Sequence, residues 1–390
     1  MVGCRPHVMA EHGAFSPSSP DEELPMTRRP IFWVVFSALG LAGAIVAVQL
    51  FTVALPNVSL DISMDRAAAM ADASSLADRM GWGPDSARAA ASFGQADPEV
   101  QTYVELEGGG RDAFQDLMDA GVYQPYQWQV RLFAEGQVTE TRVRFSPAGE
   151  PYGFRVRRAE DDPGAGNLNE AQARSVAEDA GTAWPVDLGR YSLLDSSEEE
   201  QPGGRVDHTF VYERQDVTLA EARFRLRLVV AGDQLTELTH FVFVPEAFSR
   251  RYADMRSTND AIALVSSSIF MLIFVLLGAG VGSALLLRRR WIEWRTALAW
   301  GAASAALFGL NAINALPLAW MGYDTALSSK LFVFQNIASA GAIALLGAPL
   351  LAFFFLAGES LGRKAFPEHL QQWRFWNRDV AASNTALGMT

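Results

Sequence analysis

The chain has 390 residues and a formal net charge of −12, with 44 acidic side chains against 32 basic ones, which excludes a generally basic nucleic-acid-binding protein. Hydrophobic residues make up 49% and charged residues 19%, so the chain is too apolar for a disordered polypeptide and too charged for a membrane bundle throughout. The single cysteine, Cys4, excludes a disulfide framework and a cysteine-based zinc site.

Four stretches without a charged residue or histidine are long enough to cross a bilayer, which takes about 20 apolar residues in a helix. They cover residues 31–55, 261–287, 296–321 and 331–357. The first is much longer than the apolar core of a signal peptide, roughly 7 to 15 residues, so we expect a retained anchor. Residues 1–30 before it are expected to be a disordered cytoplasmic tail, with Met26 as an alternative start.

Basic residues beside the spans predict their orientation. Arg28 and Arg29 precede the first span, four arginines lie between residues 288 and 295, and four basic residues lie between residues 363 and 378. These flanks share one side, which the positive-inside rule assigns to the cytoplasm. We therefore predict a multi-pass protein of the cell (inner) membrane, with residues 56–259 extracytoplasmic and residues 358–390 as a cytoplasmic juxtamembrane tail.

Residues 56–259 predict an α+β domain of two helix-plus-antiparallel-sheet repeats, at about 60–160 and 167–246. In the first repeat we expect a helix near residues 63–80 and strands near 100–105, 128–133, 140–145 and 152–157. In the second we expect a helix that Asn169 caps and Gly181 closes, then strands near 191–194, 208–213, 223–230 and 238–244. The predicted fold class is thus four membrane-spanning helices, three of them in residues 261–357, plus this extracytoplasmic domain.

Metal-ligand residue types occur in the second repeat, at Asp207, His208, Glu213, His240 and Glu246. Nothing in their spacing brings them together, so we expect ordinary, partly buried strand residues and predict no metal ligand. Residues 198–200, a run of three glutamates before Pro202-Gly203-Gly204, predict a solvated acidic turn.

Polar residues inside the predicted spans are candidates for contacts between helices. Asn311, Asn314, Gln335 and Asn336 are expected to hydrogen-bond across helices, and a substrate path is the alternative explanation. Gly278 and Gly282 form a small-xxx-small pair that predicts tight helix packing. Glu359 and Arg363 share a helix face, so we expect an ion pair that closes the helix end instead of a catalytic pair.

Three strings of the sequence carry a resemblance to a known family: DHTFVYER at 207–214, VPEAFSRRY at 244–252 and ESLGRKAFP at 359–367. In this order, behind one anchor, they resemble the N-terminal half of long bacterial members of the CPBP family of intramembrane metalloproteases. These are relatives of the CAAX prenyl endopeptidases. The resemblance covers roughly residues 26 to 390.

The resemblance implies a zinc-dependent membrane endopeptidase whose catalytic core lies in later spans, with Glu-Glu-x-x-x-Arg, Phe-x-x-x-His and His-x-x-x-Asn or Asp motifs. This chain departs from that pattern. Gly358-Glu359 replaces the double glutamate, His369 follows Phe366 one residue too early, and no third motif follows. We therefore carry over no catalytic residue, predict no cofactor in this chain, and expect zinc only where a protease core follows.

The resemblance therefore predicts a noncatalytic membrane part whose outer domain binds a peptide substrate or protein partner for a protease core, located downstream or on another chain. The alternative is a stand-alone membrane-anchored sensor or scaffold. A transporter subunit has less support, because the spans show neither inverted repeats nor a charge at their midpoint. In each case the lipid bilayer is a partner and nucleic acid is not.

Overall fold

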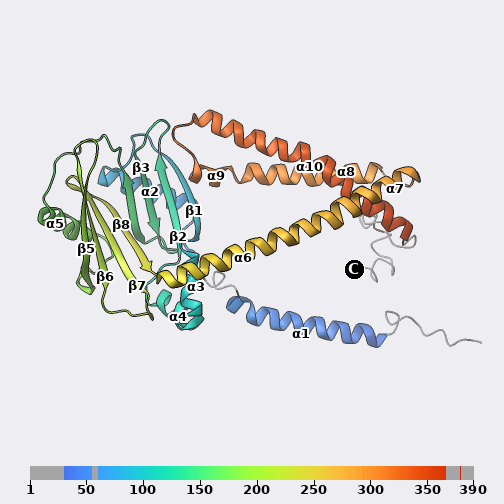
Figure 1. The fold of residues 1–390 in the computed structure, drawn as a ribbon, viewed down its shortest axis with the longest axis horizontal. Coiled ribbons are helices and arrows are strands. Elements are labelled where there is room, and N and C mark those ends of the chain that lie inside the picture. The colour runs from blue at the N-terminus through green and yellow to red at the C-terminus, as the bar shows by residue number, and fades with distance from the viewer. Residues whose placement is uncertain (1–29, 55–59, 293, 366–377, 379–390) are drawn as a thin grey trace, which may run out of the picture. The chain divides into compact units, whose positions relative to one another are not determined.

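A computed structural model describes residues 30–54, 60–292, 294–365 and 378 (Figure 1). The expectations for Cys4, Met26, His369 and most of residues 1–30 and 366–390 lie outside this part of the chain. The chain divides into two units, Met1–Leu60 and Asp61–Thr390, which are described separately.

The first unit contributes one apolar helix, α1 (Pro30–Ala54), of 25 residues. At 1.5 Å per residue it is about 37 Å long, which exceeds the roughly 30 Å hydrocarbon core of a bilayer. Its large side chains, such as Leu39 and Val48, are exposed along the helix. The first predicted span is therefore confirmed as a helix long and apolar enough to cross a membrane.

The second unit contains an eight-stranded antiparallel sheet in the order β1-β2-β3-β4-β8-β7-β6-β5 (Figure 1). Its strands are β1 (Arg88–Gln95), β2 (Tyr126–Phe133), β3 (Glu140–Phe145), β4 (Pro151–Arg157), β5 (Tyr191–Glu200), β6 (Val206–Arg214), β7 (Arg223–Ala231) and β8 (Gln234–Phe243). The chain builds each half as a helix followed by a four-stranded meander. The helix α2 (Arg66–Met80) precedes β1 to β4, and α5 (Glu170–Gly181) and a short 3₁₀ turn, η3 (Leu188–Arg190), precede β5 to β8.

Local signals fix both helices. The Asp65 side chain accepts a hydrogen bond from the amide of Ala68 and caps α2, and Gly81 ends it with a φ of 66° that suits glycine. Asn169 caps α5, as predicted, and forms a capping box with Gln172. The helix extends through Gly181, and Thr182 is its C-terminal cap.

Two local predictions were wrong, and one strand was missed. Residues 100–105 belong to a helix, α3 (Pro98–Leu106), because Asp97 accepts hydrogen bonds from the amides of Glu99 and Val100, and Pro98 starts the first turn. Strand β1 was not predicted, since its alanines have little strand propensity and it depends on pairing with β2. The glutamates at 198–200 continue β5 opposite Val206–His208 instead of forming a turn. A further helix, α4 (Gly110–Asp119), follows α3.

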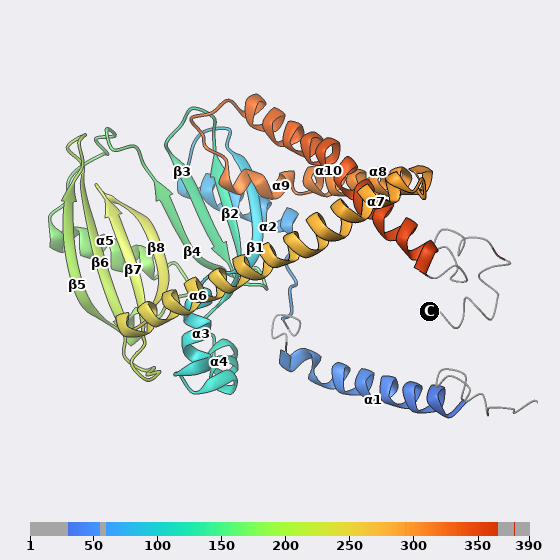
Figure 2. The same ribbon diagram turned by 45° about the vertical axis from the view of Figure 1, so that its right-hand side comes forward.

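Both helices α2 and α5 cover the same face of the sheet (Figure 2). Ala69, Ala73 and Ala77 of α2 are buried in a core with Val130 and Val143, and Ala173 and Ala177 of α5 are buried with Phe210, Leu226 and Leu228. Since strand side chains alternate between faces, the residues between these core positions lie on the opposite face, which we call the helix-free face. Its central strands carry mainly arginines.

The two halves of the sheet meet at a short joint. Strand β4 pairs with β8 through Phe154↔Leu238 and Arg155↔Glu237. On the helix-covered face, Trp82 and Trp184 stack on Phe154 with ring centroids 4.0 and 4.7 Å away. Gly153 permits the joint, since a Cβ atom there would lie 2.5 Å from the carbonyl oxygen of Leu238.

After the sheet, the chain forms three long helical segments. They are α6 (Glu246–Phe270), which continues as the π-helix η4 (Met271–Val281) and α7 (Gly282–Arg288), then α8 (Trp294–Asn314), and α10 (Ser329–Ala365). Each is long and apolar enough to cross a membrane, so with α1 the described residues hold the four predicted spans. The third ends earlier than residue 321, because Pro317 supplies no amide to continue α8, and the chain enters α9 (Leu316–Ala319) and the 3₁₀ turn η5 (Trp320–Gly322).

The loop between α8 and α10 is fixed to the helix-free face by contacts that we call the arginine clamp. Arg131 Nε donates to Glu140 Oε2 at 2.8 Å, and Arg131 Nη1 donates to the carbonyls of Met321 and Tyr323 at 3.2 and 2.6 Å. The Arg131 and Glu140 side chains are 8% and 10% exposed. Around them Phe133 and Ala90 pack with Trp320 and Tyr323.

The joint generates a stability prediction. Replacing Gly153 with alanine should lower the free energy of unfolding by about 1–3 kcal/mol, because the added methyl group meets the β8 backbone, which cannot move aside without breaking the pairing. Gly94→Ala is the matched control, since no atom lies within 4 Å of a Cβ atom at that strand position. Thermal unfolding of the full-length protein in detergent measures both, and equal melting temperatures for the two variants would contradict the prediction.

Candidate functional site

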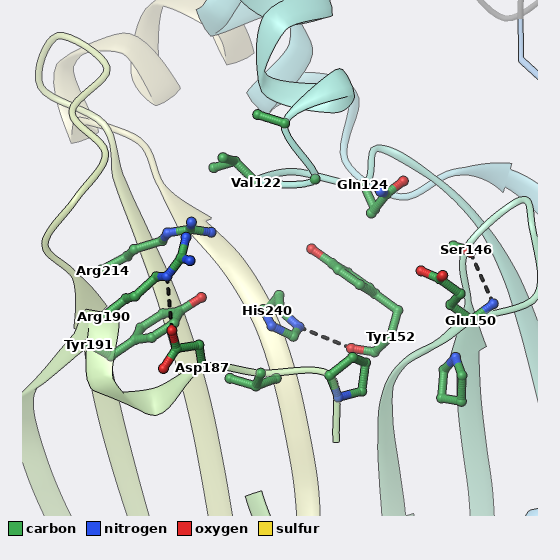
Figure 3. Close-up of a pocket in the computed structure, with 15 residues that line it drawn as sticks. Val122, Gln124, Ser146, Glu150, Tyr152, Asp187, Arg190, Tyr191, Arg214 and His240 are labelled. Carbon is green, nitrogen blue, oxygen red and sulfur yellow. Dashed lines mark hydrogen bonds and ion pairs between the residues drawn. The ribbon is translucent and has the colours of Figure 1, made fainter. Parts of the chain in front are cut away.

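Beyond the joint, β4 and β8 diverge and leave a notch between the two halves of the sheet. Two cavities of about 290 and 220 Å³ open there, and Val122, Tyr152, Tyr191 and His240 line both. Figure 3 shows His240 on β8 and Tyr152 on β4 pointing toward each other across this gap. The notch is therefore the place where residues from both halves converge.

The two arginines that line the larger cavity are each paired with an aspartate, and Figure 3 shows the pair of Arg190 with Asp187. Arg190 Nε lies 3.0 Å from Asp187 Oδ2, and Arg214 Nε lies 2.7 Å from Asp216 Oδ1. At the rim, the amide of Glu150 donates to Ser146 Oγ at 3.1 Å. These ion pairs are at least partly exposed, so each adds little to stability and leaves little net charge.

Polar atoms in the smaller cavity lack partners. Tyr123 Oη, Gln127 Oε1 and Thr239 Oγ1 are buried and have no hydrogen-bond partner within the described part of the chain. Tyr123 is 6% and Gln127 4% exposed. A buried polar atom left without a hydrogen bond costs about 1–3 kcal/mol. Three such atoms in one cavity wall indicate a site that a ligand or bound water completes.

Arg144 adds a positive charge to this wall. It makes neither a salt bridge nor a hydrogen bond within the described ranges, whereas its neighbour Arg225 is paired with Glu213 at 3.0 Å. Burial lowers the pKa of the Arg144 guanidinium, and Glu237 opposes that change electrostatically. A guanidinium stays protonated in proteins, so Arg144 presents an unpaired cation to the cavity.

Three titratable groups of the notch, His240, Tyr123 and Tyr152, are held neutral. His240 Nδ1 lies 3.0 Å from the Tyr152 carbonyl oxygen, and the two rings stack with centroids 4.4 Å apart. Burial lowers the pKa of His240 to about 4, so the ring is neutral at pH 7. Burial also raises the pKa of the Tyr123 and Tyr152 hydroxyls, which keep their protons. The smaller cavity thus offers the unpaired Arg144 cation with neutral donors and acceptors, beside the Asp97 carboxylate, which accepts hydrogen bonds from the amides of Glu99 and Val100.

The structure does not bring the five metal-type residues together. His208 Nε2 lies 2.8 Å from the Leu168 carbonyl, Glu213 pairs with Arg225 and Glu246 with Arg250. No group of three histidine, cysteine, aspartate or glutamate side chains that could hold a metal occurs among the described residues.

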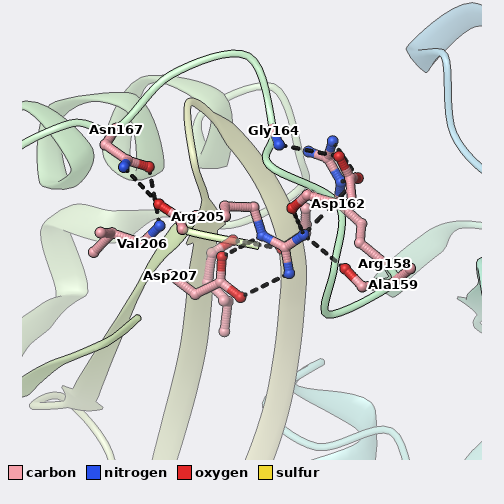
Figure 4. A network of polar contacts seen from close by, with 11 residues as sticks. Arg158, Ala159, Asp162, Gly164, Asn167, Arg205, Val206 and Asp207 are labelled. Carbon is pink, nitrogen blue, oxygen red and sulfur yellow. Dashed lines mark hydrogen bonds and ion pairs between the residues drawn. The ribbon is translucent and has the colours of Figure 1, made fainter. Parts of the chain in front are cut away.

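Asp207 belongs to a network that ties β6 to the loop between the halves (Figure 4). Arg205 Nε donates to Asp207 Oδ1 at 2.7 Å, and Arg205 Nη1 donates to the carbonyls of Ala159 and Asp162. Arg158 pairs with the Asp162 carboxylate at 2.7 Å. The network holds the connection between β4 and α5 in place, so Asp207 has a structural role.

The predicted intramembrane contacts have different environments. A Cβ atom on Gly282 would lie 3.4 Å from Leu361 of α10, whereas Gly278 is exposed. Closer packing occurs elsewhere, because a Cβ atom on Gly301 of α8 would lie 2.5 Å from the Ala352 amide of α10. The same helices meet at Gly309, beside Ala344.

Asn311, Asn314 and Gln335 lie on exposed surfaces of α8 and α10. Asn336 donates to the Phe332 carbonyl of its own helix at 2.9 Å. Hydrogen bonds from these amides to other helices stay a prediction. Glu359 and Arg363 form the expected ion pair, at 2.7 Å.

Of the residues that line the notch, the sequence analysis named only His240 as a candidate site residue. Arg144 belongs to the strand predicted at 140–145, and Gln127 lies just before the strand predicted at 128–133. Their common cavity depends on how β4 and β8 pair, at Phe154↔Leu238 and Arg155↔Glu237. The one local signal was Gly153, an isolated glycine in a strand, which often marks close approach of another backbone. No family model matches the chain, and neither a curated protein nor a solved structure matches it.

The buried histidine predicts a pH dependence of stability. The pKa of His240 falls from 6.5 to about 4 on folding, so the unfolded chain binds a proton that the folded chain does not bind between these values. Stability should therefore decrease as the pH falls from 6.5 to 4, by roughly 3 kcal/mol from this residue. Chemical unfolding at several pH values measures the slope. His240→Gln should flatten it in this window, and an unchanged slope in the variant would contradict the assignment.

Proposed function

We propose that this chain is a multi-pass cell-membrane protein whose sheet domain lies outside the cytoplasm and binds a peptide or peptide-like ligand by its carboxylate in the notch. The observation that carries this proposal is the smaller cavity, where the unpaired Arg144 lies beside the unpartnered polar atoms of Tyr123, Gln127 and Thr239. A domain whose function was only structural would gain stability by replacing these groups with apolar ones.

The chemistry of the wall favours a peptide end. A guanidinium binds a carboxylate through two parallel hydrogen bonds, and hydroxyls of Tyr123 and Thr239 add donors. Gln127 Oε1 accepts a hydrogen bond, as an amide or ammonium group of the same ligand would supply. Phe224 and Phe241 line the same cavity and offer apolar contact to a side chain. The edge of β8 beyond Leu238, where β4 diverges, suits the backbone of an extended peptide.

The proposed orientation rests on the two ends of α10. At one end, the loop before Ser329 is held by the arginine clamp on the sheet. At the other end, Lys364 and Arg289 lie against the Trp291 ring, at 4.4 and 5.1 Å from its centroid. The positive-inside rule assigns this basic end to the cytoplasm and the sheet to the opposite side.

The two halves, each a helix and a four-stranded meander, favour a duplicated unit, so we retain the proposal of two repeats. The resemblance to CPBP proteases adds a narrower version of the function. In it, the bound peptide is a substrate for a zinc-dependent protease core located downstream or on another chain. This version rests on the three sequence strings alone, and a stand-alone sensor or scaffold is the alternative.

The binding proposal predicts a dependence on the carboxylate. Fluorescence anisotropy of the full-length protein in detergent, with a pool of labelled tripeptides, should show binding of peptides with free carboxyl ends and loss of binding on amidation. Arg144→Gln should weaken binding about 10- to 100-fold, because a charged hydrogen bond is lost. Arg174→Gln, on the outer surface of α5, is the control and should have no effect. Equal binding of free and amidated peptides, or none of either, would refute the proposal.

The orientation is tested with reporter fusions. Alkaline phosphatase fused after Gly232, in the turn between β7 and β8, should be active, and a fluorescent protein fused after Arg290 should fluoresce. The phosphatase requires an oxidising compartment, whereas the fluorescent protein folds in the cytoplasm. An inactive phosphatase together with a cytoplasmic signal after Gly232 would reverse the topology.

A further inference from the structure

A second candidate site lies on the helix-free face, in what we call the arginine groove. Arg142, Arg144, Arg155 and Arg157 surround Glu140 there, in a cavity of about 250 Å³. The groove belongs to strands β3 and β4, and Arg155 and Arg157 do not line the notch. It therefore differs from the proposed peptide site, although Arg144 contributes to both walls.

The groove holds a surplus of positive charge that folding itself does not favour. In the antiparallel register, Arg142 lies directly opposite Arg155 on β4 and directly opposite Arg131 on β2. Like charges in such positions are destabilising. The register is fixed by the core on the other face, so these arginines cannot avoid one another by slipping along the strand.

Two glutamates neutralise only part of this charge. Glu140 is shared between Arg131 and Arg142, at 2.5 and 3.1 Å, and Glu237 pairs with Arg155 at 3.2 Å. Arg157 is exposed and, in the part of the chain that the structure describes, forms no salt bridge. Arg144 is likewise unpaired within the described ranges. An anion in the groove would relieve the repulsion that the two glutamates leave.

The position of the groove indicates where that anion comes from. Glu140 connects it to the arginine clamp, since Oε1 contacts Arg142 and Oε2 contacts Arg131, which holds the Tyr323 carbonyl. The adjacent β2–β3 turn bonds the start of α10, where Glu135 Oε2 accepts from the amide of Ser329 at 3.0 Å. The groove thus begins on β3, one strand spacing, about 4.8 Å, from Arg131 on β2. Arg131 holds the loop that leads into the apolar helix α10.

Aromatic residues packed around the clamp also indicate that the groove lies near a membrane interface. Trp320 and Tyr323 lie where α9 and η5 leave the apolar helix α8, and tryptophan and tyrosine are enriched at membrane interfaces. We propose that the arginine groove binds the phosphate of an anionic phospholipid headgroup in the leaflet next to the sheet domain. A guanidinium fork matches the geometry of phosphate oxygens, and several forks converge here.

The test is lipid retention by the full-length protein. Native mass spectrometry after incubation in detergent with equimolar phosphatidylglycerol and phosphatidylcholine measures the ratio of bound lipids. The wild-type protein should retain phosphatidylglycerol in preference, and Arg155→Gln with Arg157→Gln should reduce that ratio about fivefold for each arginine removed. Arg79→Gln with Arg174→Gln, two arginines on the helices of the opposite face, is the matched control and should leave the ratio unchanged.

A variant that conserves the charge distinguishes loss of lipid binding from loss of folding. Arg155→Lys with Arg157→Lys should keep most of the preference, because the charges remain. An unchanged ratio in the glutamine variant would overturn the proposal, as would an equal loss in the control variant. Binding of inorganic phosphate tests whether the ligand of the groove is a soluble anion instead of a lipid. Equal retention of both lipids, together with phosphate binding that requires Arg155 and Arg157, would contradict a lipid as the ligand.

Discussion

The buried ion pair between Arg131 and Glu140 fixes the loop between the apolar helices α8 and α10 to the sheet. Both side chains are withdrawn from water. The Arg131 guanidinium contacts a carboxylate on β3, two loop carbonyls and the Phe133 ring, whose centroid lies 4.7 Å from Cζ. Removing one member of a buried ion pair leaves the other charge without a partner, which lowers the free energy of unfolding by about 3–5 kcal/mol. The clamp therefore gives one region of the helix-free face a fixed contact with the loop between α8 and α10.

Strands β2 and β3 contribute residues to both sites and to the clamp. Strand β2 bears Gln127 in the notch and Arg131 in the clamp, and β3 bears Glu140 in the clamp and Arg144 in the notch and the groove. A ligand in the notch and a lipid in the groove would thus contact strands that also hold the loop between α8 and α10. The short β4–β8 joint connects the two halves through the pairing near Gly153 and the stack of Trp82, Phe154 and Trp184.

Composition and alternation predicted those parts of the fold that depend on local sequence. The four apolar helices follow from uncharged runs, and β7 follows from Arg223-Phe224-Arg225-Leu226-Arg227-Leu228, where every second residue faces the core. Helix α3 was missed because Val100, Tyr103 and Val104 favour a strand, whereas the Asp97 cap and Pro98 decide the structure. Strand β1 was missed because its alanines are selected by packing against α2, a tertiary effect.

The sites depend on distant pairings that no local pattern contains. Arg131 and Tyr323 are 192 positions apart, and the notch exists because β4 meets β8 instead of β5. The strands that carry Arg142 and Arg155 were predicted from the local sequence, but no local pattern indicated that the same face contacts the loop between α8 and α10.

Hydrogen–deuterium exchange of the full-length protein tests the clamp most directly. The amide of Gly136 donates to the Thr325 carbonyl at 2.7 Å and that of Ser329 to Glu135, so both should exchange slowly in the wild-type protein. Arg131→Met should accelerate exchange in residues 134–137 and 320–329 while β6 and β7 keep their protection, because the loop is released and the sheet remains. Rapid exchange of these amides in the wild-type protein, or exchange unaffected by the substitution, would contradict the account.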